Sequence, residues 1–528
     1  MLTGALAKWF DEADIEDTAM VGGKGASLGE MYQKLSGIGV KVPNGFTLTT
    51  EAFREFVNAE IPESTWDNVG NPEGIEDVRR RAIACSTLSS ALEVCLRDAD
   101  TSDHLGLNGR ASLARSLVRE TPVPESVKRA IGAEYSKLCD MYYPGVDVAV
   151  RSSATTEDSA EASFAGQYES YLNVSGESEI VEKWRRCVAS MFTERSVGYH
   201  LENDMHPLDS SIAVVVMKMA RSDKACSGVM FTIDPDSGHD GVIHIGSSYG
   251  LGELVVQGVV SPDTYTIWKE GLRMGKFPIV YRTLGGKEQM MVYNEESTNE
   301  VHTIQVSIDE RKKWSLSKDE CVSLAEMGLK IEDYFGMPMD IEWAKDGISN
   351  ELFIVQARPE TIHSKSSESK MMLYKIDEKL TSKLKKDGRV IAEGQAVGTR
   401  VGTGMVRLYR TYSEVVQGRR ELQGLIDTGL SPEEISSELS VFEKGDVLVT
   451  EMTTPDWEPL MKQASLIITR KGGRTSHAAI IAREFGIPAI VGCSDALEIP
   501  NLSTVTGSCA EGDICLLYTS PSPRDSCA

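Results

Sequence analysis

The segment Gly472-Gly473-Arg474-Thr475-Ser476-His477-Ala478-Ala479-Ile480-Ile481-Ala482-Arg483 constrains the structure of this chain more than any other. It follows an apolar, strand-like segment at residues 465–469, and its second half has the apolar spacing of an amphipathic helix. Two adjacent glycines allow backbone N–H groups to approach a ligand closely. We therefore predict a strand-to-helix turn that places His477 in the first turn of the helix.

This position suits a histidine that carries a phosphoryl group. The N-terminus of a helix offers N–H donors without partners and a partial positive charge, and both stabilise a bound phosphate. Imidazole is neutral and nucleophilic near physiological pH, so it can accept a phosphoryl group and pass it on. The alternative is an ordinary surface histidine, but the complete frame favours a catalytic His477. The surrounding loop would be formed by Gly472, Gly473, Arg474, Thr475 and Ser476.

Length and composition indicate an ordinary globular protein. The 528 residues predict three or four compact units, and 41% of them are hydrophobic and 25% charged. The formal net charge of −24 argues against a general binder of nucleic acid or of anionic membranes. The ten cysteines form no C-x-x-C pair, which disfavours structural zinc and a disulfide framework. With no signal-peptide pattern at its start, the chain is expected to be a cytoplasmic enzyme with reduced thiols.

The pattern of apolar residues predicts four regions. Residues 1–360 form a first domain, 361–387 a polar linker or an ordinary surface loop, 388–514 a compact α/β domain, and 515–528 an aberrant or disordered tail. The first domain is predicted to be mostly helical over 61–146, with strands at 148–154, 212–219 and 228–233, a glycine-rich turn that opens a helix at 28–35, a helix at 321–335 and a hairpin at 339–358. The α/β domain is predicted to have strands at 446–450, 466–469 and 488–491 and helices at 455–464 and 476–485.

Two basic residues are candidates for holding a nucleotide. Lys24 follows two glycines, although Gly-Gly-Lys-Gly lacks the spacing and the following Ser or Thr of a P-loop. Arg151 lies on a predicted strand before a Ser-Ser-Ala-Thr-Thr turn, where its guanidinium can bind phosphate oxygens. A structural salt bridge is an equally good explanation of Arg151.

The predicted hairpin groups four polar side chains. Because alternate side chains of a strand share a face, Asp340 and Glu342 point to one side and Ile341 to the other. On the partner strand, Gln356 and Arg358 likewise share a face. Such a set can hold Mg²⁺ together with a polyphosphate. The alternative is a half-exposed hairpin with a solvated polar face.

The histidine segment, continued through Glu484-Phe-Gly-Ile-Pro-Ala-Ile-Val-Gly492, resembles the phosphohistidine swivelling domain of phosphoenolpyruvate-utilising enzymes. The first domain resembles the nucleotide-binding domain of the dikinases in this group, which has an ATP-grasp fold. The resemblance therefore implies an α/β and α+β multidomain protein. The segments that carry the second resemblance are Gly22–Met31, Ala149–Asp158, Ala162–Asn173, Gly250–Gly258, Asp340–Trp343 and Val355–Thr361.

In detail, the chain is similar to the phosphoenolpyruvate synthase (pyruvate, water dikinase) family, which converts ATP, pyruvate and water into AMP, phosphoenolpyruvate and phosphate. The segment Glu451-Met-Thr-Thr-Pro-Asp-Trp-Glu-Pro-Leu-Met461 supports that family. The resemblance implies that ATP lies against Lys24, Arg151, Gln356 and Arg358, with Mg²⁺ near Asp340 and Glu342. It also implies that His477 attacks the β-phosphorus of ATP.

The family has a C-terminal barrel that binds pyruvate and phosphoenolpyruvate. We expect no segment of these residues to correspond to that barrel. On its own, the chain would then phosphorylate itself and turn over pyruvate only with a barrel supplied by another chain. The full-length family also suggests a homodimer. Two alternatives stay open: an antibiotic kinase similar to rifampicin phosphotransferase, and a non-catalytic nucleotide-binding or phosphocarrier module.

Overall fold

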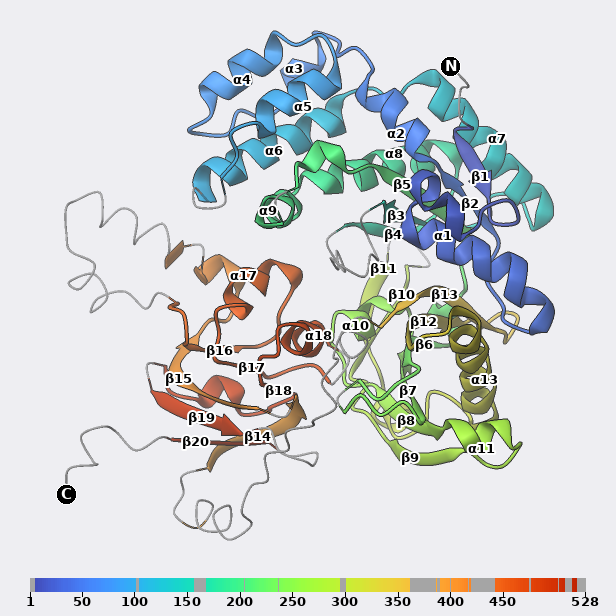
Figure 1. Ribbon diagram of the computed structural model, residues 1–528, viewed down its shortest axis with the longest axis vertical. Coiled ribbons are helices and arrows are strands. Elements are labelled where there is room, and N and C mark those ends of the chain that lie inside the picture. The colour runs from blue at the N-terminus through green and yellow to red at the C-terminus, as the bar shows by residue number, and fades with distance from the viewer. Residues whose placement is uncertain are drawn as a thin grey trace. The chain divides into compact units, whose positions relative to one another are not determined.

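The computed structural model describes residues 5–100, 104–155, 168–203, 205–235, 237–294, 301–360, 386, 390–398, 400–415, 417–418, 442–473, 476–501, 503–508 and 515–519. Contacts between Cα atoms divide the chain into two compact units (Figure 1). Unit 1 comprises residues 1–225, 292–303 and 327–359, and unit 2 comprises 226–291, 304–326 and 360–528. The last division coincides with the domain boundary predicted at 360, whereas residues 226–291 and 304–326 group with the C-terminal part. The linker predicted at 361–387 lies outside the described residues except for residue 386.

A five-stranded antiparallel sheet organises unit 1. Its strands lie in the order β1 (Ala7–Trp9), β2 (Gly45–Leu48), β5 (Ile212–Lys218), β3 (Val148–Ala154) and β4 (Ser170–Val174). The near-continuous apolar sequence of β5 fits a central strand that is buried on both faces. The strands predicted at 148–154 and 212–219 are therefore confirmed.

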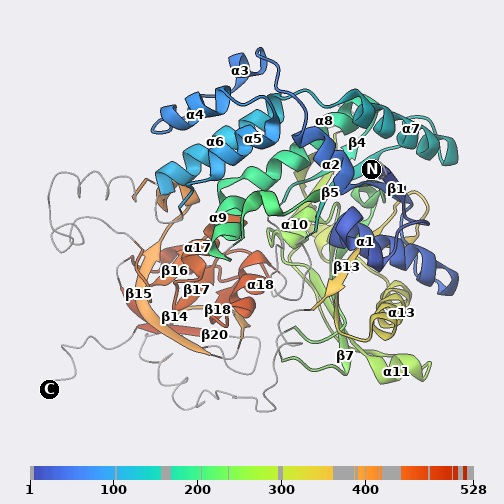
Figure 2. The ribbon, with the colours of Figure 1, turned by 45° about the horizontal axis from the view of Figure 1, so that its top comes forward.

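Helices from the region 50–202 pack on this sheet and on one another, and α4, α5 and α6 lie side by side (Figures 1 and 2). Their apolar residues share one large core with the strands, which confirms the helical prediction for 61–146. The helices are α2 (Thr50–Val57), α3 (Thr65–Asn68), α4 (Glu76–Ile83), α5 (Leu88–Leu96), α6 (His104–Glu120), α7 (Glu125–Met141), α8 (Glu177–Ala189) and α9 (Glu194–Glu202).

The glycine-rich segment differs from its prediction. Helix α1 spans Thr18–Leu35, so it begins ten residues before the predicted start, and Gly22 interrupts it with φ 71° and ψ 171°. A Cβ atom on Gly22 would lie 2.5 Å from the carbonyl carbon of Ser153 on β3. The Ser153 hydroxyl donates to the Val21 carbonyl at 2.8 Å and accepts from the Gly25 N–H at 3.0 Å. The glycines thus allow the helix to lie against the sheet, a long-range reason that local pattern does not reveal.

The remaining strands of the first 360 residues form hairpins and meanders. In unit 1, β12 (Met339–Lys345) pairs antiparallel with β13 (Leu352–Pro359), which confirms the predicted hairpin. Helix α13 (Lys318–Phe335) precedes it, as the pattern at 321–335 predicted. Strands β10 (Gln289–Tyr293) and β11 (Val301–Gln305) form a two-stranded sheet. Unit 2 contains the antiparallel meander β6 (Cys226–Phe231), β7 (Val242–Tyr249), β8 (Asp263–Trp268) and β9 (Ile279–Thr283), with short helices α10 (Glu253–Val256), α11 (Lys269–Arg273) and α12 (Ile308–Arg311).

The C-terminal part of unit 2 is a closed barrel in the order β14-β18-β17-β16-β15-β19-β20. The pairs β15–β16, β16–β17 and β17–β18 are parallel, whereas β18 pairs antiparallel with β14 and β15 with β19. One core lies inside the barrel and another beneath its helices. The predicted alternation of strands and helices is confirmed, although the helix predicted at 455–464 is only a 3₁₀ turn followed by one short helix. The elements are β14 (Val390–Val397), β15 (Val401–Leu408), β16 (Val447–Thr450), η6 (Pro455–Trp457), α17 (Glu458–Met461), β17 (Leu466–Thr469), α18 (His477–Glu484), β18 (Ala489–Val491), β19 (Thr504–Ser508) and β20 (Cys515–Thr519).

The start of the predicted tail also differs. Residues 515–519 form β20, which pairs antiparallel with both β14 and β19. A barrel closes only when each strand edge has a partner, and this segment supplies the N–H and C=O groups for two edges. The pairing with β14 joins segments that are far apart in the sequence. The residues of β20 have no alternating apolar pattern, so no local signal indicated the strand. Residues 520–528 lie outside the described part of the chain.

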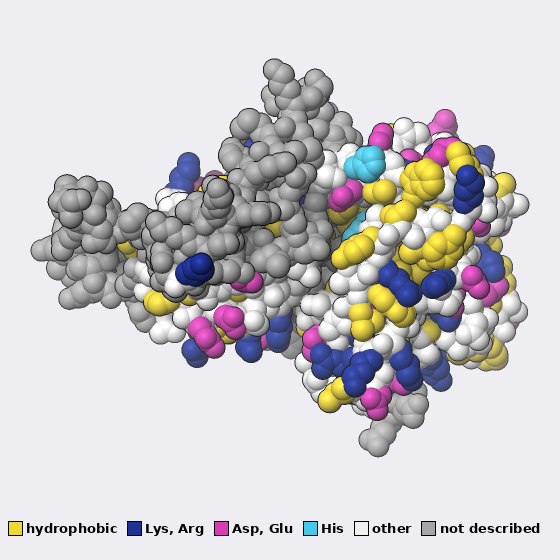
Figure 3. Space-filling model, turned by 90° about the horizontal axis from the view of Figure 1, so that it is seen from below, with side chains coloured by type: hydrophobic (Ala, Val, Ile, Leu, Met, Phe, Trp, Pro, Cys, Tyr) yellow, Lys and Arg dark blue, Asp and Glu magenta, His cyan; other side chains and the backbone are white. Residues whose placement is uncertain are grey.

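Unit 2 exposes large hydrophobic side chains around β9. Figure 3 shows hydrophobic side chains among Lys and Arg residues on the side where Figure 1 places α11 and β9. The most exposed of these hydrophobic residues near β9 are Met274, Phe277, Val280 and Tyr281. Within the described residues, no helix combines the length and the apolar character needed to cross a membrane.

Candidate functional site

His477 is the first residue of α18, at the turn that follows β17. Ser476 caps this helix, because its hydroxyl accepts a bond from the Ala479 N–H at 3.4 Å. Gly472 has φ 101°, a conformation that favours glycine, and a Cβ there would approach the Ser476 Cβ to 2.9 Å. The predicted strand-to-helix turn is therefore present. Arg474 and Thr475 of the predicted loop lie outside the described residues, whereas Gly473 is described and buried.

The imidazole of His477 is oriented by a residue that the sequence analysis did not single out. Nδ1 of His477 lies 3.1 Å from Oγ1 of Thr453, which is buried in the segment after β16. Where Nδ1 carries the proton, it donates to Thr453 and leaves the lone pair on Nε2. The motif Glu451–Met461 had been noted as a family marker, but no local pattern indicates that one of its threonines reaches His477.

A second polar cluster lies in unit 1, where Arg151 on β3 reaches the hairpin. The guanidinium of Arg151 donates to the Val355 carbonyl at 2.8 Å, to Glu342 Oε2 at 2.7 Å and to Gln356 Oε1 at 2.7 Å. The salt bridge considered from the sequence is therefore present. It places Arg151, Glu342 and Gln356 together, although 191 and 205 residues separate Arg151 from the other two.

The hairpin register arranges the other predicted residues. Asp340 lies opposite Arg358 and Glu342 opposite Gln356. The Arg358 guanidinium donates two bonds to Asp340 Oδ2, at 2.9 and 2.7 Å. Ile341 and Trp343 are buried on the opposite face. The predicted alternation of faces is thus confirmed, and both carboxylates of the pair bond to arginines.

Lys24 lies on α1 and is buried, with only 8% of its surface exposed. Its charge acts on Glu342. Burial alone would raise the pKa of Glu342, but the Arg151 guanidinium, and then Arg358 and Lys24, hold that pKa below its ordinary value. The cluster therefore holds three cations, Lys24, Arg151 and Arg358, against two carboxylates, Asp340 and Glu342. This excess of positive charge is suited to bind the phosphates of a nucleotide.

The lowered pKa of Glu342 predicts a pH effect on stability. A carboxylate whose pKa falls on folding stabilises the protein above its unfolded pKa, about 4.3 for Glu, and loses this contribution as the pH falls through its folded pKa. We expect the urea midpoint of Glu342→Gln to fall less than that of the native chain between pH 6 and pH 3, roughly the window set by these values. The control is Glu51→Gln at an exposed helix pair. Parallel curves for Glu342→Gln and the native chain would contradict the assignment.

Metal ligands were predicted at Asp340 and Glu342. Among the described residues, no group of three or more His, Cys, Asp and Glu side chains is placed to hold a metal ion. Mg²⁺ nevertheless needs only one or two carboxylates when phosphate oxygens and water complete its shell. The two carboxylates and the Gln356 amide oxygen supply ligands of the kind that Mg²⁺ prefers.

Comparison with known proteins gives two family matches and many relatives. The family described as "Pyruvate phosphate dikinase, AMP/ATP-binding domain" matches residues 18–378, and that described as "PEP-utilising enzyme, mobile domain" matches residues 442–512. The chain is 41% identical to the phosphoenolpyruvate synthase of Synechocystis sp. over 98% of this chain and 57% of the relative. It is 40% identical to those of Aquifex aeolicus, covering 97% of this chain and 55% of the relative, and Escherichia coli, covering 97% and 57%. The chain thus spans a little over half the length of these curated relatives.

Proposed function

We propose that this chain, which belongs to the pyruvate phosphate dikinase AMP/ATP-binding domain family, uses ATP to phosphorylate its own His477. Membership confirms the family resemblance drawn from the motifs. One observation carries the proposal: an imidazole at the start of α18, oriented through Nδ1 by Thr453, lies within the segment that matches the mobile domain. A histidine held in this way has the nucleophilic nitrogen and the nearby N–H donors that a phosphoryl acceptor needs.

The cluster in unit 1 is the proposed ATP site. Lys24, Arg151, Gln356 and Arg358 would bind the nucleotide, because their side chains gather around two carboxylates on one hairpin face. Asp340 and Glu342 would hold Mg²⁺, whose chemistry is to neutralise charge on the phosphates. The guanidinium groups of Arg151 and Arg358 would bind phosphate oxygens and orient the chain of phosphates for in-line attack.

The transfer itself requires one bond to form and one to break. Nε2 of His477 would attack the β-phosphorus, and the bond from that phosphorus to the α,β-bridging oxygen would break, so that AMP leaves. Water would then cleave the β,γ linkage, release phosphate and leave the β-phosphoryl group on Nε2. Oγ1 of Thr453 would accept a hydrogen bond from the Nδ1–H of His477 throughout and stabilise the charge on the ring.

The phosphohistidine would serve the synthesis of phosphoenolpyruvate from pyruvate in the whole protein. This step rests on the relatives, which are named phosphoenolpyruvate synthases. A cytoplasmic location belongs to the same proposal.

Labelled ATP tests the proposed transfer directly. Incubation with [β-³²P]ATP and Mg²⁺ should give a chain that keeps its label in alkali and loses it in acid, and [γ-³²P]ATP should leave little stable label. Label retained from the γ position alone would contradict the proposed route. ATP binding with no label from either position would favour the non-catalytic alternative.

Thr453 offers a further prediction. Thr453→Val keeps the shape of the side chain but removes the oxygen at Nδ1, so we expect self-phosphorylation to slow by roughly 10- to 100-fold, in the range of 1.4–2.7 kcal/mol at the transition state. Thr453→Ser restores the hydroxyl and should recover most of the rate. The measurement is the single-turnover rate of β-label incorporation, with nucleotide affinity determined in parallel. Equal rates for the Val and Ser variants would remove Thr453 from the mechanism.

A further inference from the structure

The turn that carries His477, which the structure describes at Gly472, Gly473 and Ser476, lies against a second loop of unit 2. This second loop follows α10. Gly258 in this loop has φ 71° and lies so close to Ser476 that a Cβ added to it would be 2.7 Å from the Ser476 Cα and closer still to its Cβ. A Cβ on Gly472 would likewise meet the Gly258 carbonyl oxygen at 3.1 Å. A Cβ on Gly473 would meet Cδ of Pro262 at 3.5 Å. Backbone therefore meets backbone at Gly258 with no space for a side chain.

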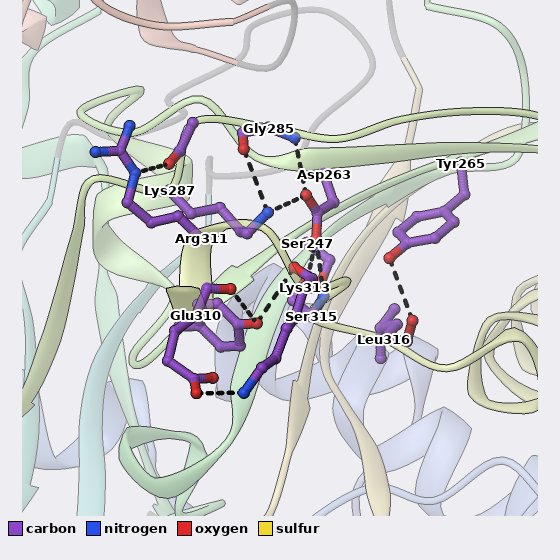
Figure 4. A network of polar contacts seen from close by, with 12 residues as sticks. Ser247, Asp263, Tyr265, Gly285, Lys287, Glu310, Arg311, Lys313, Ser315 and Leu316 are labelled. Carbon is purple, nitrogen blue, oxygen red and sulfur yellow. Dashed lines mark hydrogen bonds and ion pairs between the residues drawn. The ribbon is translucent and has the colours of Figure 1, made fainter. Parts of the chain in front are cut away.

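Five residues after Gly258, the chain enters a buried polar network around Asp263 and Lys287 (Figure 4). Asp263 and Lys287 are both 0% exposed and form an ion pair. Asp263 also accepts bonds at 2.8 Å from the Gly285 N–H and from the N–H and hydroxyl of Ser315. All its acceptor oxygens are therefore used inside the fold.

This network holds the backbone immediately before Asp263. The Lys287 N–H donates to the Ser261 carbonyl at 3.1 Å. A Cβ on Gly285 would collide with the carbonyls of Ser261 and Pro262, so these backbones also pack directly together. Residues 258–262 are thus held at their C-terminal end, beside a buried ion pair whose polar groups are satisfied.

We propose that residues 258–262 form the surface, here called the seat, against which the turn carrying His477 is positioned for phosphoryl transfer, and that Gly258 is the positioning residue that sets how closely the turn approaches. The inference rests on the proposed function for its catalytic consequence, but the seat itself rests on the contacts alone. A methyl group at position 258 would push Ser476, and with it the first turn of α18, away from the seat. Displacements of about 1 Å at reacting groups cost roughly 100-fold in rate.

Gly258→Ala tests the seat, and Gly275→Ala is a closely matched control. Gly275 has φ 64°, similar to the 71° of Gly258, but nothing lies within 4 Å of its added Cβ. The two variants therefore impose the same backbone strain and differ only in the clash. We expect Gly258→Ala to incorporate β-label from ATP roughly 10- to 100-fold more slowly, with unchanged affinity for ATP, and Gly275→Ala to keep the native rate.

Hydrogen–deuterium exchange supplies a readout that does not depend on catalysis. In Gly258→Ala, the amides of residues 470–473, 476–480 and 256–261 should exchange faster than in Gly275→Ala, since the turn no longer covers the seat. Native exchange in both segments would overturn the seat. Faster exchange with a native labelling rate would overturn its catalytic role. If the native chain incorporated no β-label from ATP, the proposed function would be wrong. The exchange rates would then still show whether residues 258–262 contact the turn that carries His477.

Discussion

His477→Ala should incorporate no acid-labile label from [β-³²P]ATP, with a rate at least about 10³-fold below that of the native chain. The reason is chemical: alanine has no nucleophile, and removal of a catalytic nucleophile has cost up to roughly 10⁶-fold in other enzymes. Loss of fold is not expected to contribute, because the ring is half-exposed and Ser476, which caps α18, stays in place. Far-ultraviolet circular dichroism and the melting temperature should therefore match those of the native chain.

His302→Ala is the control for this result. His302 lies exposed on β11, and its removal leaves both polar clusters unchanged. The His302→Ala variant should incorporate β-label from ATP at the native rate and lose that label in acid. Label that persists in His477→Ala would place the phosphoryl group on another residue and would remove the central assignment. ATP affinity should be the same in both variants, since the proposed nucleotide residues are untouched.

Lys287→Met should destabilise unit 2 by about 3–5 kcal/mol, the largest effect on stability that we expect from one substitution. The variant leaves the Asp263 carboxylate buried without its cation, and water cannot reach it, since both partners are fully buried. The cost is the desolvation of an unpaired charge rather than the lost attraction alone. Urea unfolding followed by tryptophan fluorescence would report it, since Trp314, one of the seven tryptophans, packs on Tyr265 of the same unit.

Two further variants separate this explanation from loss of packing. Asp263→Asn combined with Lys287→Met removes the charge and should recover much of the lost stability. Lys312→Met, at an ion pair whose side chains are 70% and 92% exposed, should change the urea midpoint little. A double variant as unstable as Lys287→Met would show that shape, not charge, dominates at this site. Since the pair anchors residues 258–262, Lys287→Met should also speed exchange at the seat.

Local chemistry made the histidine turn predictable. The apolar segment 466–469 forms β17, Ser476 is a preferred helix cap, and Gly472 takes a positive φ. Each feature depends on residues within a few positions of one another, so the sequence alone specified where His477 lies. The hairpin was predictable for the same reason, because alternation along two adjacent strands determines which side chains share a face.

The start of α1 shows where such reasoning fails. Glycines at 22, 23 and 25 predict a break, and by propensity a helix should begin after them. In the structure the break is confined to Gly22, and helical residues lie on both sides of it, because the glycine allows the chain to lie directly on β3. The expected break is therefore present, but only the neighbouring strand determines that it falls at Gly22 and that helix precedes it.

The sequence by itself determined the hairpin, the strand-to-helix turn at His477 and the side chains that share each strand face, because these follow from the periods of strands and helices and from the chemistry of the side chains. Only the tertiary structure brought Arg151 to Glu342, Thr453 to His477 and Gly258 to Ser476. The residues in these contacts are far apart in the sequence: 24 residues separate Thr453 from His477, and 191 separate Arg151 from Glu342. Their closeness depends on how whole strands and helices pack, and no local rule of spacing contains that information.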